Sequence, residues 1–222
     1  VAPMHRQLFL FILFVAVLWL TGCASGPRTW VAYYGRDAPP EILQAYDLIV
    51  VDSIYEAPIE SLKSRGGSVL AYLSVAEVAS HRPHFSAAHA QSLLIRENRN
   101  WKGAWLVDVR DSRWQKMVVE RLVPELLARG FDGLFLDTID SALHLERMHP
   151  RRYPGMSKAV IQLIKAIHAR HPNVKLLVNG AFPILSQLRR EVTMVAVEST
   201  ATTWNFKTKT ARWLTAAERN TA

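Results

Sequence analysis

The strongest constraint on the fold is a series of short apolar runs that alternate with segments of helical pattern. Seven such runs are predicted to be strands, and they cover residues 30–35, 48–53, 68–74, 104–108, 133–137, 175–180 and 194–198. Each run is continuous, as is typical of strands buried on both faces of a parallel sheet. Strands that alternate with helices predict an α/β fold with a parallel sheet.

The segments between the strands carry helix signals. Apolar residues recur at helical spacing over 113–127 and 157–170, and a shorter helix is predicted over 39–45. Asp111 or Ser112 is well placed to cap the first of these helices. Pro124 lies within it and should kink or split it.

The number and spacing of the strands predict a (β/α)8 TIM-barrel type. About 200 residues after the leader give about 28 per strand–helix unit, which is normal for such a barrel. An eighth strand is expected after Trp213, but the sequence stops at Ala222. We therefore expect a barrel whose eighth strand is missing or truncated at the C-terminus. An irregular eighth strand or an open sheet are the alternatives.

The N-terminal segment has the pattern of a lipoprotein signal. Residues 4–6 are short and basic, residues 8–20 are apolar, and Leu-Thr-Gly-Cys follows at 20–23. This pattern resembles a bacterial signal peptide with a lipobox. We expect a signal peptide over 1–22, a tether over 23–28 and a barrel domain over 29–222, with acyl chains on Cys23. A plain transmembrane anchor is the alternative, but the run is shorter than the roughly 20 residues of a span.

These signals predict an exported protein held to the membrane at Cys23, and Ala24 favours the outer membrane facing the periplasm. The formal net charge is +8. Lys and Arg are scattered along the chain, so we interpret the charge as a basic surface near anionic lipid or polysaccharide. Nucleic acid is not an expected partner, and the sequence does not indicate an oligomeric state.

Carboxylates end two of the predicted strands. Asp137 ends the run over 133–137, and Glu198 ends the run over 194–198. Ligands of parallel α/β folds lie beyond the carboxyl ends of the strands. Cleavage of a glycosidic bond requires two carboxyl groups across the bond, and these two form the best pair. Asp140 is a third candidate, although a helix cap explains it equally well.

Other strand ends supply aromatic, acidic and amide side chains. Such groups suit a sugar, whose C–H face packs on aromatic rings while its hydroxyls bond to polar groups. The predicted substrate-binding residues are Tyr34, Asp52, Tyr72, Glu77, Asp108, Asn179 and Trp204. Asp52 and Asp108 have an alternative role as hydrogen-bonding residues of the strand ends. Asp132 lies before its strand and is predicted to be structural. No His-Glu-x-x-His pattern is present, so no metal site is predicted.

These motifs together resemble glycoside hydrolase family 114, the endo-α-1,4-polygalactosaminidase-like barrels. The matching segments are 30–35, 47–52, 71–77, 130–140, 178–180 and 197–199, and the aspartate-rich segment 130–140 is the most specific. The resemblance implies a (β/α)8 barrel without a cofactor that hydrolyses α-1,4-linked galactosamine-containing exopolysaccharide. It also implies a catalytic pair made of Asp137 or Asp140 with Glu198.

The sequence therefore predicts a lipid-anchored glycosidase with Asp137 as nucleophile and Glu198 as general acid/base. A non-catalytic polysaccharide-binding lipoprotein and a barrel hydrolase of another α-glycoside are the alternatives. One tension accompanies this prediction, because a partly deacetylated galactosamine polymer and this chain are both cationic.

Overall fold

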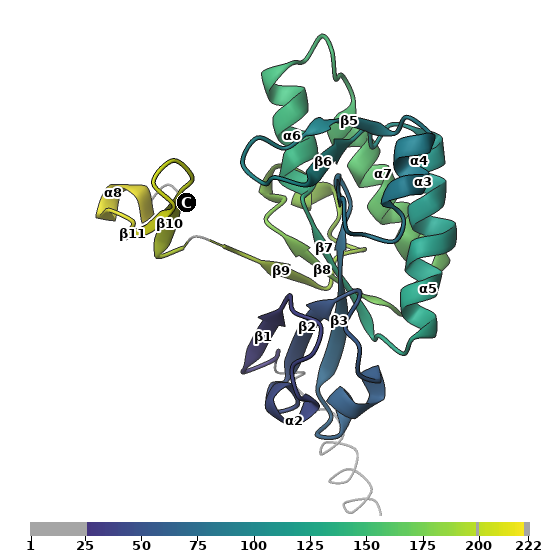
Figure 1. Ribbon diagram of the computed structural model, residues 1–222, viewed down its shortest axis with the longest axis vertical. Coiled ribbons are helices and arrows are strands. Elements are labelled where there is room, and N and C mark those ends of the chain that lie inside the picture. The colour runs from purple at the N-terminus through teal and green to yellow at the C-terminus, as the bar shows by residue number, and fades with distance from the viewer. Residues whose placement is uncertain (1–25, 199, 220–222) are drawn as a thin grey trace, which may run out of the picture.

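The computed structural model describes residues 26–198 and 200–219. Its centre is a parallel sheet in the order β1-β2-β3-β7-β8-β9 that curls into half a barrel (Figure 1). The strands are β1 (Trp30–Tyr33), β2 (Leu48–Asp52), β3 (Ser68–Ser74), β7 (Gly133–Asp137), β8 (Lys175–Asn179) and β9 (Met194–Ala196). The predicted α/β class with TIM-barrel-type strands is confirmed.

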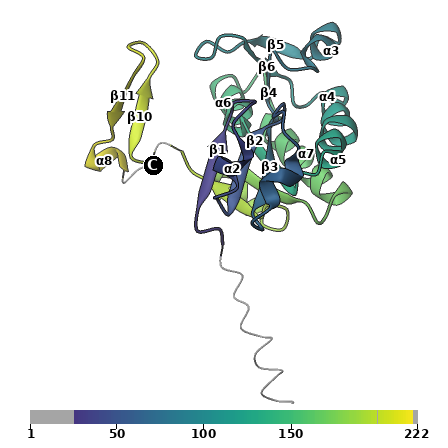
Figure 2. The same ribbon diagram turned by 60° about the horizontal axis from the view of Figure 1, so that its bottom comes forward.

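Most helices pack on the convex face of this sheet. The helices are α2 (Pro40–Leu43), η1 (Ile59–Lys63), α3 (Phe85–Ala90), α4 (Ser112–Met117), η2 (Val118–Leu122), α5 (Val123–Ala128), α6 (Ile139–Met148), α7 (Met156–Arg170) and η3 (Phe182–Gln187), of which α3 lies beside β5 (Leu94–Glu97) instead (Figure 2). The main core lies between helices and sheet, where α7 alone contributes seven buried side chains. This burial of apolar surface is the main stabilising term of the fold.

The concave face of the sheet holds a second, smaller core. Alternate residues of neighbouring strands meet there, with Leu48 and Val50 from β2, Leu70 from β3, Phe135 from β7 and Leu177 from β8. Successive side chains of a strand point to opposite faces, so the continuous apolar runs supply both cores at once. The next inward positions along each strand lie at the carboxyl edge of the sheet.

The predicted strand over 104–108 is not part of the parallel sheet, and this part of the prediction is wrong. Its residues form β6 (Ala104–Val107), which pairs antiparallel with β4 (Glu77–Ala79) and β5 (Leu94–Glu97) in a separate sheet. Only the second half of β6 is buried, since Ala104 and Trp105 are partly open to solvent. An apolar run carries no information on strand direction, so the sequence did not distinguish this insertion from a barrel strand.

The C-terminal part of the described chain forms a hairpin that stands apart from the half-barrel. β10 (Thr202–Asn205) and β11 (Thr210–Trp213) pair antiparallel, and α8 (Ala216–Arg219) follows (Figures 1 and 2). The rings of Trp101 and Phe206 meet edge to face, 5.6 Å apart, and connect the hairpin to the β5–β6 loop. In the described residues the parallel sheet has six strands, and no seventh or eighth follows β9.

Three local predictions are confirmed by contacts. The Asp111 side chain accepts a hydrogen bond from the Arg113 amide and caps α4. The helix is split before Pro124 by the π-helical turn η2, because proline has no N–H to continue the α-helical ladder. Asp132 is structural, since it accepts hydrogen bonds from Lys63 Nζ and the Val69 amide, both at 2.8 Å.

Candidate active site

The carboxyl edge of the sheet collects the polar side chains that the alternation of the strands turns inward. Asp52 is in register with Tyr72, Ser74 with Asp137, and Asn179 with Ala196, two residues before Glu198. Asp52, Tyr72, Asp137 and Asn179 each lie two residues after an apolar residue of the concave core, so they share its face. This face of the sheet is therefore apolar along the strands and polar at their carboxyl ends.

Asp137 is held from both sides. The Tyr72 hydroxyl donates to its Oδ2 at 2.8 Å, and the Asn179 amide donates to its Oδ1 at 2.9 Å. Tyr72 comes from β3 and Asn179 from β8, the two strands that flank β7. Both oxygens thus accept hydrogen bonds, an arrangement that suits a carboxylate anion of fixed orientation.

The turn after Asp137 is conformationally strained. Thr138 has a φ of 62°, in the left-handed region that a β-branched residue rarely adopts. Its Oγ1 accepts from the Ala76 amide at 3.1 Å and lies 2.8 Å from Ser74 Oγ. These contacts with the segment after β3 hold the turn in place, and such strain is frequent beside functional groups.

Glu198 lies across the cleft mouth from β7, two strands away. Glu198 is exposed as a residue, but the protein withdraws its carboxyl group partly from water, and this desolvation raises its pKa. The negative charge of Asp137 raises the pKa further. The nearby Asn179 side chain acts in the opposite direction and lowers this pKa. Asp137, Asn179 and Glu198 line one cleft, so the two predicted catalytic carboxyl groups share it.

Asp140 and Glu77 form the acidic side of the cleft next to Asp137. Asp140 is in the first turn of α6, and Thr138 occupies the N-cap position of this helix without a side-chain capping hydrogen bond. Burial within the cleft and the charge of Asp137 raise the Asp140 pKa. Glu77 is only 6% exposed. Its Oε1 accepts from Ser141 Oγ at 2.6 Å and Asn98 Nδ2 at 2.9 Å.

Two tyrosines form an aromatic wall above these acids. The rings of Tyr34 and Tyr72 pack edge to face with centroids 5.2 Å apart. Burial raises the Tyr34 pKa to about 12, and the charges of Asp137, Glu198 and Asp52 contribute. Tyr34 is half exposed, so its ring is available to a ligand in the cleft.

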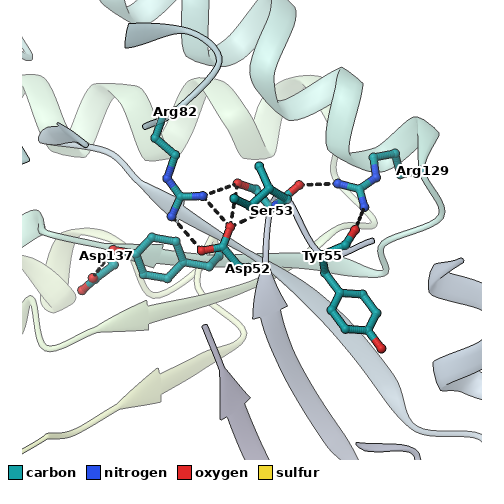
Figure 3. A network of polar contacts seen from close by, with 8 residues as sticks. Asp52, Ser53, Tyr55, Arg82, Arg129 and Asp137 are labelled. Carbon is teal, nitrogen blue, oxygen red and sulfur yellow. Dashed lines mark hydrogen bonds and ion pairs between the residues drawn. The ribbon is translucent and has the colours of Figure 1, made fainter. Parts of the chain in front are cut away.

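Asp52 is engaged in a buried ion pair. Arg82 binds both of its carboxylate oxygens, with NH2 to Oδ2 at 2.9 Å, and also donates to Ser53 Oγ (Figure 3). Asp52 is 4% exposed, and the Arg82 guanidinium lies 5.5 Å from the centroid of the Tyr72 ring. Nearby, Arg129 donates to the carbonyls of Ser53 and Tyr55. The network connects Asp52 through Arg82 to the tyrosine that holds Asp137.

Two predicted substrate-binding residues lie elsewhere. Asp108 accepts two hydrogen bonds from the Arg110 guanidinium, at 2.8 and 2.7 Å, and one from the Arg110 amide, at 3.1 Å. These bonds lower its pKa, and Asp108 does not line the cleft. Asp108 directly follows β6, and because β6 belongs to the separate antiparallel sheet, Asp108 does not lie at the carboxyl edge of the parallel sheet. Trp204 is on β10 of the hairpin, whose cleft-lining side chain is Phe206. Cys23 lies outside the described residues.

The sequence did not single out several residues that the structure brings to the site. Arg82, Asn98, Thr138 and Ser141 bind the predicted acids or the turns that carry them. Ser141 and Thr138 lie within four residues of Asp137, so their proximity was readable from the sequence. Arg82 and Asn98 come from the insertion around β4 and β5. The path of this insertion over the sheet could not be predicted from the sequence.

Together these residues line an open cleft of about 2000 Å³. This exceeds the roughly 300–1,000 Å³ of a small-molecule pocket and suits several units of a polymer. In the described part of the chain, no three His, Cys, Asp or Glu side chains are grouped to hold a metal ion. No helix there is both long and apolar enough to cross a bilayer.

Comparison with known proteins gives a consistent result. The model of glycoside-hydrolase family GH114 matches residues 20–217. The glycoside hydrolase domain of PelA from Pseudomonas aeruginosa aligns with a TM-score of 0.77 and 26% identity, over 88% of this chain and 76% of that domain. Ega3 from Aspergillus fumigatus, solved in complex with galactosamine, aligns with a TM-score of 0.58 and 18% identity, over 76% of this chain and 66% of Ega3. The Ega3 likeness concerns the fold alone.

Two curated sequence relatives are uncharacterized and longer than the matched region. A protein of Deinococcus radiodurans is 27% identical over 60% of this chain and 45% of its own length. A protein of Methanocaldococcus jannaschii is 30% identical over 38% of this chain and 25% of its own length. This chain thus spans less than half of either relative.

Proposed function

This chain belongs to glycoside-hydrolase family GH114, and on that premise we propose that it hydrolyses α-1,4-linked galactosamine or N-acetylgalactosamine exopolysaccharide. Its family and fold make it a glycosidase. The sugar class is the one that the family resemblance of the sequence implies. The observation that carries the catalytic assignment is that Asp137, held by Tyr72 and Asn179, lines the same cleft as Glu198.

The different surroundings of the two carboxyl groups support different roles. Asp137, with hydrogen bonds to both oxygens, is oriented as a carboxylate nucleophile. The raised pKa of Glu198 suits a group that carries a proton at the start of the reaction. Glu198 would give its proton to the glycosidic oxygen while Asp137 attacks the anomeric carbon. Glu198 would then take a proton from the water that releases the sugar from Asp137, a retaining sequence.

Asp140 is the competing catalytic aspartate. Asp140 lies in the first turn of α6, beyond the strained Thr138. Within the described residues, no side chain of a neighbouring strand donates to it as Tyr72 and Asn179 donate to Asp137. We therefore assign Asp140 to the electrostatic environment of Asp137.

The test is the release of reducing ends from galactosamine polymer by wild type, Asp137→Asn, Glu198→Gln and Asp140→Asn. Asp37→Asn and Glu56→Gln are matched controls, since both residues are exposed and outside the cleft. The first two variants should lose about 10²–10⁴-fold in rate, typical for removal of an acid/base group, whereas the controls keep full activity. Equal rates for wild type, Asp137→Asn and Glu198→Gln would contradict the assignment and favour a non-catalytic binding protein. A panel of other α-linked polymers tests the sugar.

We also propose that the protein is exported and lipid-anchored at Cys23. The support is the sequence pattern of residues 4–23. Wild type expressed in a bacterium with labelled fatty acid should carry the label and sediment with membranes. Cys23→Ala should do neither, and a labelled Cys23→Ala protein would contradict the proposal.

A further inference from the structure

The cleft continues beyond the acids, and its outer part has the opposite charge. Its floor carries Glu77, Asp137, Asp140 and Glu198. Its outer wall is formed by the β5–β6 loop and by the end of α6 with the turn that follows, which lie close together above the sheet (Figures 1 and 2). Five cations line the cleft there: Arg96 of β5, Arg99 and Lys102 of the β5–β6 loop, Arg147 near the end of α6 and Arg152 of the turn that follows. We call these five residues the basic rim.

In the described part of the chain, no carboxylate forms an ion pair with the basic rim. Arg96 donates to the Glu97 carbonyl at 3.3 Å, Arg147 lies 3.3 Å from the His144 ring nitrogen, and Arg152 lies over the Tyr153 ring. Arg82, deeper in the same cleft, is by contrast fully engaged by Asp52. The charges of the rim are therefore available to a ligand.

The acids of the same two segments are committed to backbone amides. Glu97 Oε1 accepts from the Gly103 amide at 2.6 Å. The two oxygens of Glu146 accept from the Gly155 and Ser157 amides, at 2.5 and 2.8 Å, at the start of α7. In the described residues, neither carboxylate forms an ion pair with the basic rim, so the cations of the rim are left for a ligand.

An aromatic surface lies among these cations. Trp101 is 61% exposed, lines the cleft between Arg99 and Lys102, and meets Phe206 of the hairpin. Aromatic faces pack on the C–H face of sugar rings, and guanidinium groups bind carboxylate, sulfate or phosphate in bidentate fashion. Neither uncharged sugar nor a hydrocarbon chain would use both features.

We propose that the basic rim binds acidic groups of the polysaccharide, carboxylate or sulfate esters, on units displaced from the one that is cleaved. The substrate class is then a galactosamine-containing polysaccharide that also carries acid groups on some of its units. This proposal rests on the proposed function for the position at which the polysaccharide is cleaved. The binding of acid groups to the basic rim does not depend on that function. Ammonium groups of a cationic polymer would meet like charges at the rim.

The test measures binding, so it is independent of catalysis. The probes are chondroitin sulfate, desulfated chondroitin, a fully N-acetylated galactosamine polymer, the deacetylated polymer and vesicles of phosphatidylglycerol. The variant Arg99→Gln/Lys102→Gln is compared with Arg189→Gln/Arg190→Gln, which removes the same charge from exposed positions outside the cleft. Isothermal titration calorimetry at two salt concentrations gives the affinities.

Wild type should bind the two acidic polymers about tenfold more tightly than the neutral one, with weaker binding at high salt. The rim variant should lose about tenfold on the acidic polymers, and the control variant should lose none. Similar binding of acidic and neutral polymers, tightest binding of the cationic polymer, or equal losses in both variants would overturn the proposal. Rim-dependent binding of vesicles but not of polymers would also overturn it in favour of a membrane contact. Loss of catalysis in Asp137→Asn with these affinities unchanged would separate the two proposals.

Discussion

At the scale of single residues, the ion pair of Asp52 and Arg82 is the most heavily buried charge in the site, with side chains 6% and 10% exposed. Burial withdraws both charges from water, so their attraction offsets a large desolvation cost only while both partners are present. The pair thus fixes Arg82 against the Tyr72 ring and contributes to the order of the site.

Removing one partner of this pair is predicted to destabilise the fold. Arg82→Met should lower the free energy of unfolding by about 3–5 kcal/mol, because it leaves Asp52 charged and unpaired. The double variant Arg82→Met/Asp52→Leu should recover most of that loss. The matched control is Arg36→Met, because the ion pair of Arg36 with Glu56 is more than half exposed. This control should change the free energy of unfolding by less than about 1 kcal/mol. Urea denaturation measures all three, and equal losses for Arg82→Met and Arg36→Met would contradict this prediction.

The hydroxyl of Tyr72 is predicted to matter for activity rather than for stability. Tyr72→Phe keeps the ring that packs on Tyr34 and Phe135 but removes the donor to Asp137. A hydrogen bond to a charged group contributes about 1.5–3 kcal/mol, so kcat should fall about 10- to 100-fold while Tm changes little. Tyr33→Phe, which removes an exposed hydrogen bond to Asp37, should leave kcat unchanged. An unchanged kcat in Tyr72→Phe would show that Asp137 does not depend on this donor.

Glu77 gives a prediction for pH. Its burial raises its pKa, hydrogen bonds from Ser141 and Asn98 offset part of this, and the charges of Asp140 and Asp137 add to it. A carboxyl group whose pKa is higher in the folded state binds its proton more tightly there, so stability falls as pH rises through that pKa. Glu77→Gln keeps an oxygen for Ser141 and Asn98 without the charge.

The Tm of Glu77→Gln should therefore exceed that of wild type at pH 7, and the difference should shrink toward the pKa of a free glutamate, near pH 4.5. Thermal unfolding monitored by circular dichroism between pH 4 and 8 checks this. Glu97→Gln is the comparison, because Glu97 is exposed on the neighbouring strand. A stabilisation that does not change with pH would point to packing rather than to charge.

At the scale of elements, β7 begins with a glycine because its neighbours leave no room for a side chain. A Cβ on Gly133 would lie 2.1 Å from the Lys175 carbonyl oxygen of β8 and 2.7 Å from Leu70 Cδ2 of β3. The segment 130–140 is thus specific in two ways, since its glycine allows close strand packing at one end and its aspartate lies in the cleft at the other.

Gly133→Ala is predicted to push β7 and β8 apart. Overpacking of this kind costs about 1–3 kcal/mol, and here the clashing atom belongs to backbone that cannot rotate away. Asn179 at the far end of β8 should shift with its strand, so kcat should fall as well as Tm. Gly26→Ala, where nothing lies within 4 Å, should alter neither quantity. A stable and fully active Gly133→Ala protein would contradict this reading of the motif.

The elements also show what the sequence could and could not predict. The six strands of the half-barrel were predicted within two residues of their ends, because continuous apolar runs between helices are typical of a parallel sheet. β6 was assigned to the wrong sheet, and Asp108 was misplaced with it, since pairing partners and direction depend on contacts distant in sequence. Arg82 was missed for the same reason, because its partner Asp52 is thirty positions away.

At the scale of the whole molecule, the cleft is bounded by segments that are far apart in the chain. The half-barrel supplies the acids, the insertion around β5 and β6 supplies the basic rim, and the hairpin reaches the same cleft through Phe206. The net charge of +8 is thus distributed unevenly, with acids at the floor and free cations at the outer wall. This arrangement allows a cationic chain to bind an amino-sugar polymer, because the ammonium groups of the polymer can contact the acids of the floor while its acid groups contact the cations of the outer wall.

The hairpin is predicted to help retain long substrates. Phe206 lines the cleft and packs on Trp101, so Phe206→Ala removes an aromatic contact at the far end of a bound polymer and frees the β5–β6 loop from the hairpin. An aromatic pair contributes about 0.5–1.5 kcal/mol beyond area burial, so KM for long polymer should rise about 3- to 10-fold. The rate at saturation should be unchanged, because the acids and their hydrogen bonds lie on the half-barrel.

Trp213→Ala is the matched control for this prediction. Trp213 lies on the same hairpin and is 74% exposed, but it does not line the cleft, so its removal should leave KM unchanged. Steady-state kinetics on polymers of graded length separate the two variants, and short oligomers should be cleaved equally well by both. If Phe206→Ala instead lowered kcat on every substrate length, the hairpin would act on the proposed catalytic carboxyl groups rather than on the bound polymer.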